Sequence, residues 1–248
     1  MTITLPTEKI QAVSTDPSYL ILYGLPKSGK TSCLAQLSNN LIIDLEGGSL
    51  FVDALAVQAR TITDLGEIAS AIRAKNTEVG HNFYKRITID NATRLEDICM
   101  GYACQLYRAT EMGKNWKGTD ITTLPRGAGY VYLRTAVKKV IDMFRELCDQ
   151  FILVGHVKDS ITDKEGEEIN AKEIDLIGKL GKIVCGMADA VGYVYRKDNE
   201  THISFKSRGD GTIMEARARH IAGKDVVIAT GNDDGSLTTY WDKIYKEG

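Results

Sequence analysis

The sequence predicts a three-layer α/β fold with a mostly parallel central sheet. Apolar runs of strand length alternate along the chain with segments whose apolar residues recur at helical spacing. A glycine-rich loop of the form G-x-x-x-x-G-K-T separates the first apolar run from the first helix-compatible segment. The chain has 248 residues, of which 43% are hydrophobic and 26% charged, and this suits one large domain with a substantial core. We therefore expect a single domain over residues 1–248, with 1–18 as an N-terminal lead-in and 216–248 as a C-terminal appendage.

The predicted strands are mostly continuous apolar runs, as expected for a parallel sheet that is covered on both faces. In chain order they span residues 20–23, 41–45, 86–90, 151–156, 188–195 and 202–206. Crossovers between parallel strands are right-handed, and ligands of such sheets bind beyond the carboxyl ends of the strands. Polar residues at those ends are therefore the first candidates for a functional site.

The predicted helices and loops fill the intervals between the strands. Two loops stand out: residues 110–130 are rich in Gly, Thr and Lys and predict a long, mobile loop, and residues 158–172 predict a second loop or a hairpin. A turn is expected at residues 232–235, which read Asn-Asp-Asp-Gly. Asp64 is a candidate N-cap for the second helix. Helical periodicity covers residues 32–37, 64–75, 95–107 and 130–147.

The glycine-rich loop has the sequence and the strand–loop–helix setting of a phosphate-binding P-loop. Its glycines let backbone N–H groups turn toward phosphate oxygens, and the following helix presents its positive end to the anion. Lys30 is expected to reach the β- and γ-phosphates of ATP, and the Thr31 hydroxyl to ligate Mg²⁺. ATP and Mg²⁺ are therefore the predicted cofactors. The predicted nucleotide-binding residues are Gly24, Leu25, Pro26, Lys27, Ser28, Gly29, Lys30, Thr31 and Ser32.

Acidic residues at two strand ends are candidates for the chemistry around the phosphates. Asp90 is expected to hold Mg²⁺ together with Thr31, although an Asp at this place could also cap the turn that follows. Glu46 is expected to orient and deprotonate the attacking water. Asp44 lies two residues earlier and competes for that role, and both could instead be solvated strand-end acids. Glu46 is favoured because it is nearer the carboxyl end of its strand.

Basic and imidazole side chains form a second set of candidates. His156 ends a buried strand, where it could sense the γ-phosphate or be a histidine with a structural role. Lys158 is either a phosphate or DNA contact or an exposed lysine. Lys206 and Arg208 lie two residues apart at the end of a late strand. They could reach a phosphate in a neighbouring subunit or a DNA backbone, or be a solvated basic strand end.

Composition narrows the classes of function. The formal net charge of -2 gives no global signature of nucleic-acid binding, so any DNA-binding surface must be local. The five cysteines contain no C-x-x-C pair and are expected to be reduced thiols and not metal ligands. The N-terminus lacks a signal-peptide pattern, and no apolar run approaches the roughly 18 residues of a membrane span. These features predict a cytoplasmic protein without a membrane partner.

The order of these motifs resembles the RecA-like ATPase core over about residues 18–215. The P-loop is followed by Asp-Leu-Glu at 44–46, Ile-Thr-Ile-Asp at 87–90 and Val-Gly-His-Val-Lys at 154–158. More narrowly, the chain resembles the short phage-encoded RecA-like proteins, including the single-strand annealing proteins of phage recombination systems. The resemblance implies a Mg²⁺-dependent ATPase that acts on single-stranded DNA as a homo-oligomer. It also implies a bacterial host cell and a single-strand-binding protein as a partner.

The resemblance assigns roles to the weaker candidates as well. It implies that Glu46 activates water, that His156 senses the γ-phosphate and leads into a DNA-binding loop, and that the late basic pair acts across a subunit interface. The pair is Lys206 and Arg208 in this chain. RecA-family proteins usually carry Gln at the sensor position, so His156 is a departure from the family pattern.

Partner and reaction remain open between several hypotheses. We expect single-stranded DNA to bind residues 110–130 and 158–182, where Trp116 could stack on a base and Lys114, Lys117 and Arg126 could contact phosphates. The main alternative is a loader-like or regulatory ATPase whose partner is a protein. A small-molecule kinase is a weaker alternative, because the chain shows no arginine-rich lid and no acceptor-binding motif.

Overall fold

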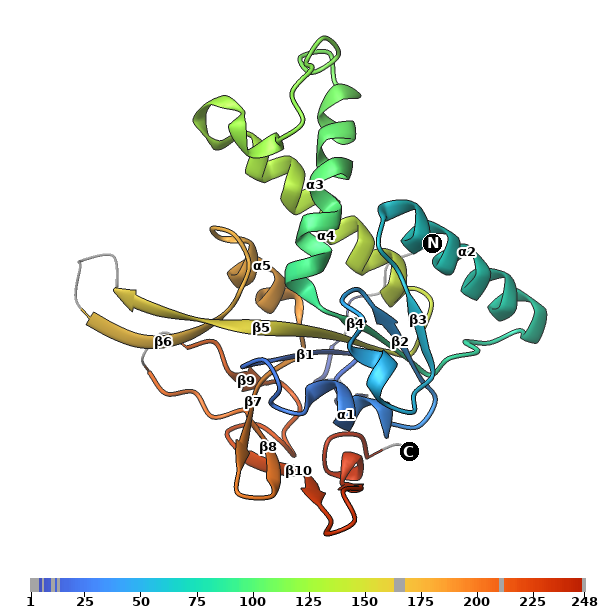
Figure 1. Ribbon diagram of the computed structural model, residues 1–248, viewed down its shortest axis with the longest axis vertical. Coiled ribbons are helices and arrows are strands. Elements are labelled where there is room, and N and C mark those ends of the chain that lie inside the picture. The colour runs from blue at the N-terminus through green and yellow to red at the C-terminus, as the bar shows by residue number, and fades with distance from the viewer. Residues whose placement is uncertain are drawn as a thin grey trace.

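The computed structural model describes residues 5, 7–9, 12, 14–162, 168–209 and 212–246. It contains one central sheet with helices on both faces (Figure 1). The strands are β1 (Tyr19–Gly24), β2 (Asn40–Asp44), β3 (Ala56–Gln58), β4 (Arg86–Asp90), β5 (Gln150–Thr162), β6 (Glu168–Ile174), β7 (Ala190–Lys197), β8 (Glu200–Ser204), β9 (Glu215–Ala216), β10 (Asp225–Gly231) and β11 (Leu237–Thr239). The α-helices are α1 (Lys30–Ala35), α2 (Ile62–Val79), α3 (Ala92–Arg108), α4 (Gly129–Arg145) and α5 (Leu180–Met187).

The centre of the sheet is parallel, as the sequence predicts. Its main path runs β11-β10-β8-β7-β1-β5-β4-β2-β3, and the pairs from β7 to β3 are all parallel. The strands β8, β10 and β11 extend one side of it in antiparallel fashion. The predicted α/β fold class with a mostly parallel sheet is therefore confirmed.

The two faces of β1 show why the core has three layers. Tyr19, Ile21 and Tyr23 pack in one cluster with buried residues of α2, α3, α4 and α5. Leu20 and Leu22 pack in a second cluster with α1 and the C-terminal residues 241–245. Because alternate residues of one strand are buried on opposite faces, the strand reads as a continuous apolar run.

The second helix begins earlier than predicted and has a different cap. α2 starts at Ile62, and its N-cap is Thr61 instead of Asp64. The Thr61 hydroxyl accepts a hydrogen bond from the Asp64 N–H, and the Asp64 carboxylate accepts one from the Thr61 N–H. This reciprocal capping box explains the error, because an Asp at its third helical position also resembles a cap.

The two predicted loops both contain regular structure. Residues 110–130 include two 3₁₀ turns, Ile121–Thr123 and Pro125–Gly127, and Ile121 and Leu124 are buried. This segment and the adjoining parts of α3 and α4 project from the body of the molecule (Figure 1). The second loop is a hairpin, since β5 continues past His156 and pairs with β6. Residues 163–167 between these strands lie outside the described residues.

The C-terminal residues belong to the same sheet and core. The predicted turn at 232–235 joins β10 to β11, and the Asn232 N–H donates to the Ser236 carbonyl. The Trp241 indole N–H donates to the Cys33 carbonyl in α1 at 2.8 Å. All five cysteines are free and buried. Within the described part of the chain, no helix combines the length and apolar character that a bilayer crossing requires.

Candidate functional site

The loop between β1 and α1 has a backbone shape that depends on glycine. Gly29 has a φ of 90°, in the left-handed region that favours glycine. A Cβ atom on Gly24 would lie 2.3 Å from the Val194 carbonyl oxygen, because β1 and β7 run side by side here. These glycines therefore let the chain turn from the buried end of β1 into the first turn of α1.

Lys30 lies buried inside this loop. Its Nζ donates to the Gly24 carbonyl at 3.0 Å, to the Leu25 carbonyl at 2.8 Å and to Ser28 Oγ at 3.3 Å. Burial lowers the pKa of Lys30, and the nearby carboxylates of Asp90 and Glu46 partly oppose this shift. The ammonium group is thus held in the loop by acceptors that an incoming phosphate could replace.

Thr31 and Asp90 form the oxygen-rich part of the site. Thr31 Oγ1 donates to Asp90 Oδ2 at 2.6 Å, which joins the first turn of α1 to the end of β4. Desolvation raises the pKa of Asp90, while the bond from Thr31 and the charge of Lys30 oppose this. A hydroxyl and a carboxylate suit Mg²⁺, which prefers oxygen ligands and keeps water and phosphate ligands as well. Among the described residues, no group of three or more His, Cys, Asp or Glu could hold a metal by itself.

The two acids that compete at the end of β2 have different surroundings. Asp44 is buried, and its carboxylate accepts bonds from the N–H groups of Glu46, Gly47 and Ser49 and from Ser49 Oγ. Burial acts to raise the pKa of Asp44, but these hydrogen bonds lower it overall. Glu46 has a side chain that is 47% exposed and has no such network. Asp44 therefore shapes the turn, and Glu46 is free to act on a ligand.

His156 connects Glu46 to the start of α3. Its Nε2 lies 3.4 Å from Glu46 Oε2 and 2.8 Å from Asn91 Nδ2. Asn91 is the N-cap of α3, and its Oδ1 accepts from the Arg94 N–H. Its amide nitrogen is therefore directed to the imidazole, which assigns His156 Nε2 as an acceptor when the ring is neutral. Within the described part of the chain, His156 Nδ1 is buried without a hydrogen-bond partner.

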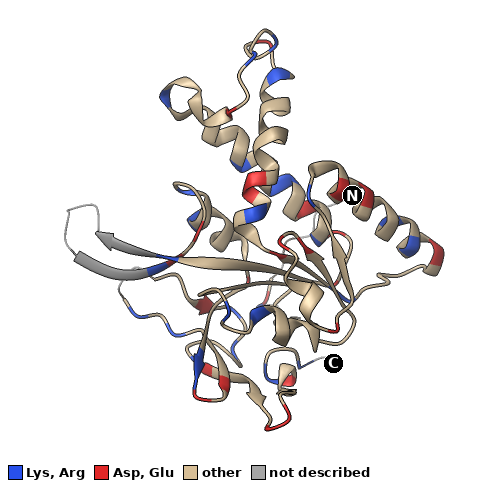
Figure 2. Ribbon diagram, in the orientation of Figure 1, with Lys and Arg blue, Asp and Glu red and all other residues tan. Residues whose placement is uncertain are grey.

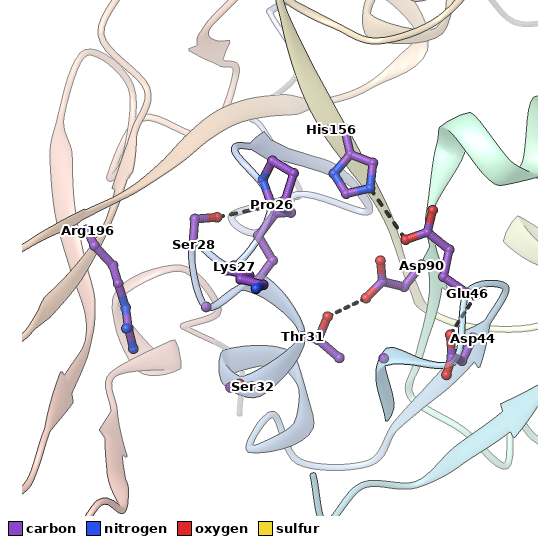
Figure 3. Close-up of a pocket in the computed structure, with 13 residues that line it drawn as sticks. Pro26, Lys27, Ser28, Thr31, Ser32, Asp44, Glu46, Asp90, His156 and Arg196 are labelled. Atoms are coloured by element: carbon purple, nitrogen blue, oxygen red, sulfur yellow. Dashed lines mark hydrogen bonds and ion pairs between the residues drawn. The ribbon is translucent and has the colours of Figure 1, made fainter. Parts of the chain in front are cut away.

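These side chains surround one cavity of about 480 Å³ (Figure 3). It lies beyond the carboxyl ends of β1, β2 and β4 and beside His156 of β5, at the edge of the sheet where ligands of parallel strands bind. The lining residues are Pro26, Lys27, Ser28, Gly29, Lys30, Thr31, Ser32, Asp44, Glu46, Gly48, Asp90, His156 and Arg196. Most of these lining residues are among the site residues that the sequence predicts.

Comparison with known proteins places the chain in a family. The family described as "AAA domain" matches residues 16–235. The chain belongs to this AAA domain family. Among solved structures, one that is similar is the crystal structure of the RadB recombinase, with a TM-score of 0.46 and 11% sequence identity over 91% of this chain and 92% of that one. No curated protein matches the chain.

Two lining residues of the AAA domain, Gly48 and Arg196, are not among the site residues that the sequence predicts. Arg196 lies near the end of β7, which runs parallel to β1. Ligands of parallel sheets bind beyond the carboxyl ends of the strands, and this rule identified Asp90 and His156 as candidates. It also applies to β7, because the carboxyl end of β7 lies at the same edge of the sheet. The polar Arg196–Lys197 end of that strand was the available signal.

The late basic pair does not line the cavity of its own chain. β8 ends at Ser204, so Lys206 and Arg208 follow the strand instead of ending it, and both are exposed. One residue beyond the strand, the Phe205 N–H still donates to the Lys224 carbonyl. The two side chains are thus available to partners outside the chain.

Several basic and aromatic residues proposed as DNA contacts are engaged within the chain. The Trp116 ring packs edge-on against Tyr107, with ring centroids 5.4 Å apart, and Arg108 lies over it at 5.3 Å. Lys114 pairs with Glu111 at 2.6 Å. Lys158 Nζ donates to the Leu176 carbonyl. Trp116 is therefore a half-buried part of the projection and offers a base less ring surface than an exposed tryptophan would.

Proposed function

We propose that the protein binds ATP with Mg²⁺ and hydrolyses it. The observation that carries this proposal is the single cavity that joins the phosphate-binding loop, the Thr31–Asp90 pair and the exposed carboxylate of Glu46. Phosphoryl transfer depends mainly on positioning and on stabilising charge, and this cavity offers both. Membership of the AAA domain family supports the same conclusion.

The backbone of the loop and four side chains of the cavity have roles in this proposal. Backbone N–H groups of the loop and the positive end of α1 bind the phosphates, and Lys30 exchanges its carbonyl partners for phosphate oxygens. Thr31 and Asp90 hold Mg²⁺, which neutralises the charge that develops on the phosphates. Glu46 orients the attacking water and accepts its proton.

His156 gives the site a connection to the rest of the fold. Its Nε2 contacts both Glu46 and the N-cap Asn91 of α3, and β5 continues from it into the hairpin with β6. A change at the γ-phosphate that moves Glu46 would therefore alter the hydrogen bond at the start of α3. This arrangement suits a sensor.

We further propose a single RecA-like domain that works on single-stranded DNA as a homo-oligomer, in recombination or annealing of the phage type. Figure 2 shows Lys and Arg scattered over the molecule, with a few on the projection formed by α3, α4 and the segment between them. Lys117 and Arg126 are exposed there and are the candidates for phosphate contacts. Lys206 and Arg208 are the candidates for contact with the γ-phosphate of a neighbouring subunit.

The test measures ATP hydrolysis with and without single-stranded DNA at two salt concentrations, with the Lys30→Ala variant as the control. We expect hydrolysis that requires Lys30 and rises when DNA is added at low salt, because phosphate contacts weaken as salt increases. Hydrolysis that ignores DNA at both concentrations would favour the alternative, a loader or regulatory ATPase with a protein partner. No hydrolysis and no ATP binding by the unaltered protein would contradict the whole proposal.

The oligomer is tested separately by mixing two inactive variants. Lys30→Ala subunits are combined with subunits that carry both Lys206→Ala and Arg208→Ala. If sites are shared between neighbours, some interfaces join an intact P-loop to an intact basic pair, and activity should return in part. A mixture with no recovered activity would argue that the basic pair does not complete a neighbour's site.

A further inference from the structure

The end of β7 carries an arginine over the phosphate-binding loop. β7 pairs with β1 in parallel, and Gly24 at the end of β1 lies opposite Val194. β7 continues to Lys197, so Arg196 stands two residues beyond the last pair. Val194 is buried in the cluster that contains α1, and side chains two residues apart lie on the same face of a strand. Arg196 is therefore carried toward the first turn of α1.

Distances confirm that Arg196 lies against this part of the loop. A Cβ atom placed on Gly29 would be 3.7 Å from Arg196 Nε and 3.3 Å from Thr201 Oγ1. Thr201 is the partner of Arg196 across the β7–β8 hairpin, so both side chains are positioned by regular strands. Burial raises the pKa of the nearby Cys33 thiol to about 11, and Thr201 and Arg196 both oppose this shift. The guanidinium thus lies beside the first turn of α1.

The guanidinium is exposed and has spare hydrogen-bonding capacity. Among the described residues, the Arg196 guanidinium has no hydrogen bond or ion pair with another side chain or carbonyl. Other arginines near the sheet are paired, such as Arg60, whose Nη1 donates to the Asp44 carbonyl at 3.1 Å. Arg196 lines the same cavity as Lys30 and Asp90. An arginine fork directed at a cavity that suits phosphates can bind two oxygens at once.

The position of Arg196 distinguishes one end of the cavity from the other. Glu46, Asp90 and His156 lie together on one side of the loop, and Arg196 lies on the opposite side (Figure 3). The acidic side with Lys30 is where the γ-phosphate and its metal are expected. The Arg196 side adjoins Gly29 and the start of α1, where the loop cradles the phosphates nearer the nucleoside.

We infer that Arg196 is a nucleotide-binding residue that holds the α-phosphate end of the nucleotide from within the same subunit. The inference rests on the proposed ATP binding and adds a residue to it. A cation at this end contacts ATP and ADP alike, because both carry the α- and β-phosphates. Arg196 therefore contributes to nucleotide affinity and not to the rate of the chemical step, unlike a cation on the γ-phosphate.

The experiment titrates ATP and ADP, each with Mg²⁺, into the unaltered protein and four variants by calorimetry, one of which is Lys30→Ala. Arg196→Ala should weaken both nucleotides by the same factor, about 10- to 100-fold for a charged hydrogen-bonding group. Lys197→Ala is the matched control, since Lys197 is the next residue and its side chain lies on the other face of β7. It should bind both nucleotides within about twofold of the unaltered protein, as expected for a surface change. Arg196→Lys should restore part of the affinity by retaining the charge.

Three outcomes would overturn the inference in different ways. Loss of ATP affinity with unchanged ADP affinity would move Arg196 to the γ-phosphate. Unchanged affinity for both nucleotides in Arg196→Ala, alongside weakened binding in Lys30→Ala, would remove Arg196 from the site and leave the proposed function standing. Absence of nucleotide binding by the unaltered protein would instead overturn the proposed function itself.

Discussion

The floor and the rim of the cavity differ in how their polar side chains are held. On the floor, polar groups are bonded to other parts of the protein. The floor residues are Lys30, Thr31, Asp44 and Asp90. At the rim, side chains are more exposed and have two contacts or fewer with other side chains. The rim residues are Glu46, His156 and Arg196. The floor thus supports the fold as well as the ligand, whereas Glu46 and Arg196 at the rim are available for the ligand and His156 joins the rim to α3.

Among the floor residues, Lys30 is the one whose substitution should have the largest effect on ATP hydrolysis. Lys30→Ala removes the cation expected on the β- and γ-phosphates, so ATP hydrolysis should fall below detection. Its bonds within the loop are to two carbonyls and one hydroxyl, so the rest of the fold should survive. The measurements are phosphate release and far-ultraviolet circular dichroism. Hydrolysis at the rate of the unaltered protein would show that the loop does not bind the reacting phosphates.

Glu46 at the rim and Asp44 on the floor belong to the same three-residue segment, so substitutions of these two acids compare rim and floor directly. Glu46→Gln should bind ATP normally but hydrolyse it about 10²–10⁴ times more slowly, because it removes the general base. Its free energy of unfolding should change by no more than about 0.5 kcal/mol.

Asp44→Asn should show the reverse pattern in the same assays. The substitution replaces one carboxylate oxygen by an amide nitrogen, which places a donor against N–H groups that donate to the Asp44 carboxylate. The free energy of unfolding should therefore fall by about 1–3 kcal/mol. Hydrolysis measured below the melting temperature should change less than in Glu46→Gln. A larger loss of rate in Asp44→Asn would move the base to Asp44 and would erase the distinction between floor and rim.

Asp90 tests whether a floor residue is stabilised by its ligand. Desolvation raises its pKa, so the ionised carboxylate is unfavourable until a cation is bound. Asp90→Asn should therefore be as stable as the unaltered protein, or more so, without ligand. The Asp90→Asn variant should lose the stabilisation that Mg²⁺ and ATP give the unaltered protein. That stabilisation is about 2.7 kcal/mol at a ligand concentration 100 times the Kd. Thermal melts with and without Mg²⁺ and ATP measure both effects, and equal ligand stabilisation in the two proteins would exclude Asp90 as a metal ligand.

Glu96 shows what burial does to an acid outside the cavity. It lies in α3, and its carboxyl group accepts from the Ile177 N–H at 3.1 Å. Burial raises its pKa from 4.5 to about 7. The folded state therefore binds the proton more tightly than the unfolded state, and the resulting stability is complete below about pH 4.5 and is lost as pH rises toward about 7.

Glu96→Gln should remove this dependence. The contribution of one proton is at most about 1.4 kcal/mol per pH unit, and the amide retains an oxygen for the Ile177 N–H. The measurement is the free energy of unfolding between pH 4.5 and 7 for both proteins. If the two curves kept the same slope, the buried carboxyl of Glu96 would not be the source of the pH dependence.

The difference between floor and rim also explains what the sequence could predict. Lys30 and Thr31 lie in one contiguous motif, and Asp90 ends an apolar strand, so local patterns identify them. The sequence alone does not decide whether Asp44 or Glu46 is the general base, since only the hydrogen bonds of the turn distinguish the two acids. Arg196 was missed because it reaches the site through the pairing of β7 with β1, which are separated by about 170 residues of chain.

Outside the cavity, local sequence patterns predicted secondary-structure elements correctly but did not predict which side chains contact one another. The strand 86–90 was predicted with its observed ends, because a buried run bounded by polar residues defines it. Trp116 lies in a polar segment that suggested an exposed ring, but Tyr107 and Arg108 from α3 enclose it. The missing information was again the packing of residues from another element, which single-sequence patterns do not contain.

The anchoring of α1 by Trp241 bears on how the protein is made on the ribosome. A helix of six residues is too short to be stable by itself, and α1 packs on β1 and on residues 241–245. The β1 strand in turn lies between β5 and β7, which are synthesised much later. The nascent chain therefore cannot complete its nucleotide-binding loop until β5, β7 and residues 241–245 have emerged. A chain halted midway would expose the glycine-rich loop without the strands that give it shape, so nucleotide binding should report that synthesis has passed residue 241.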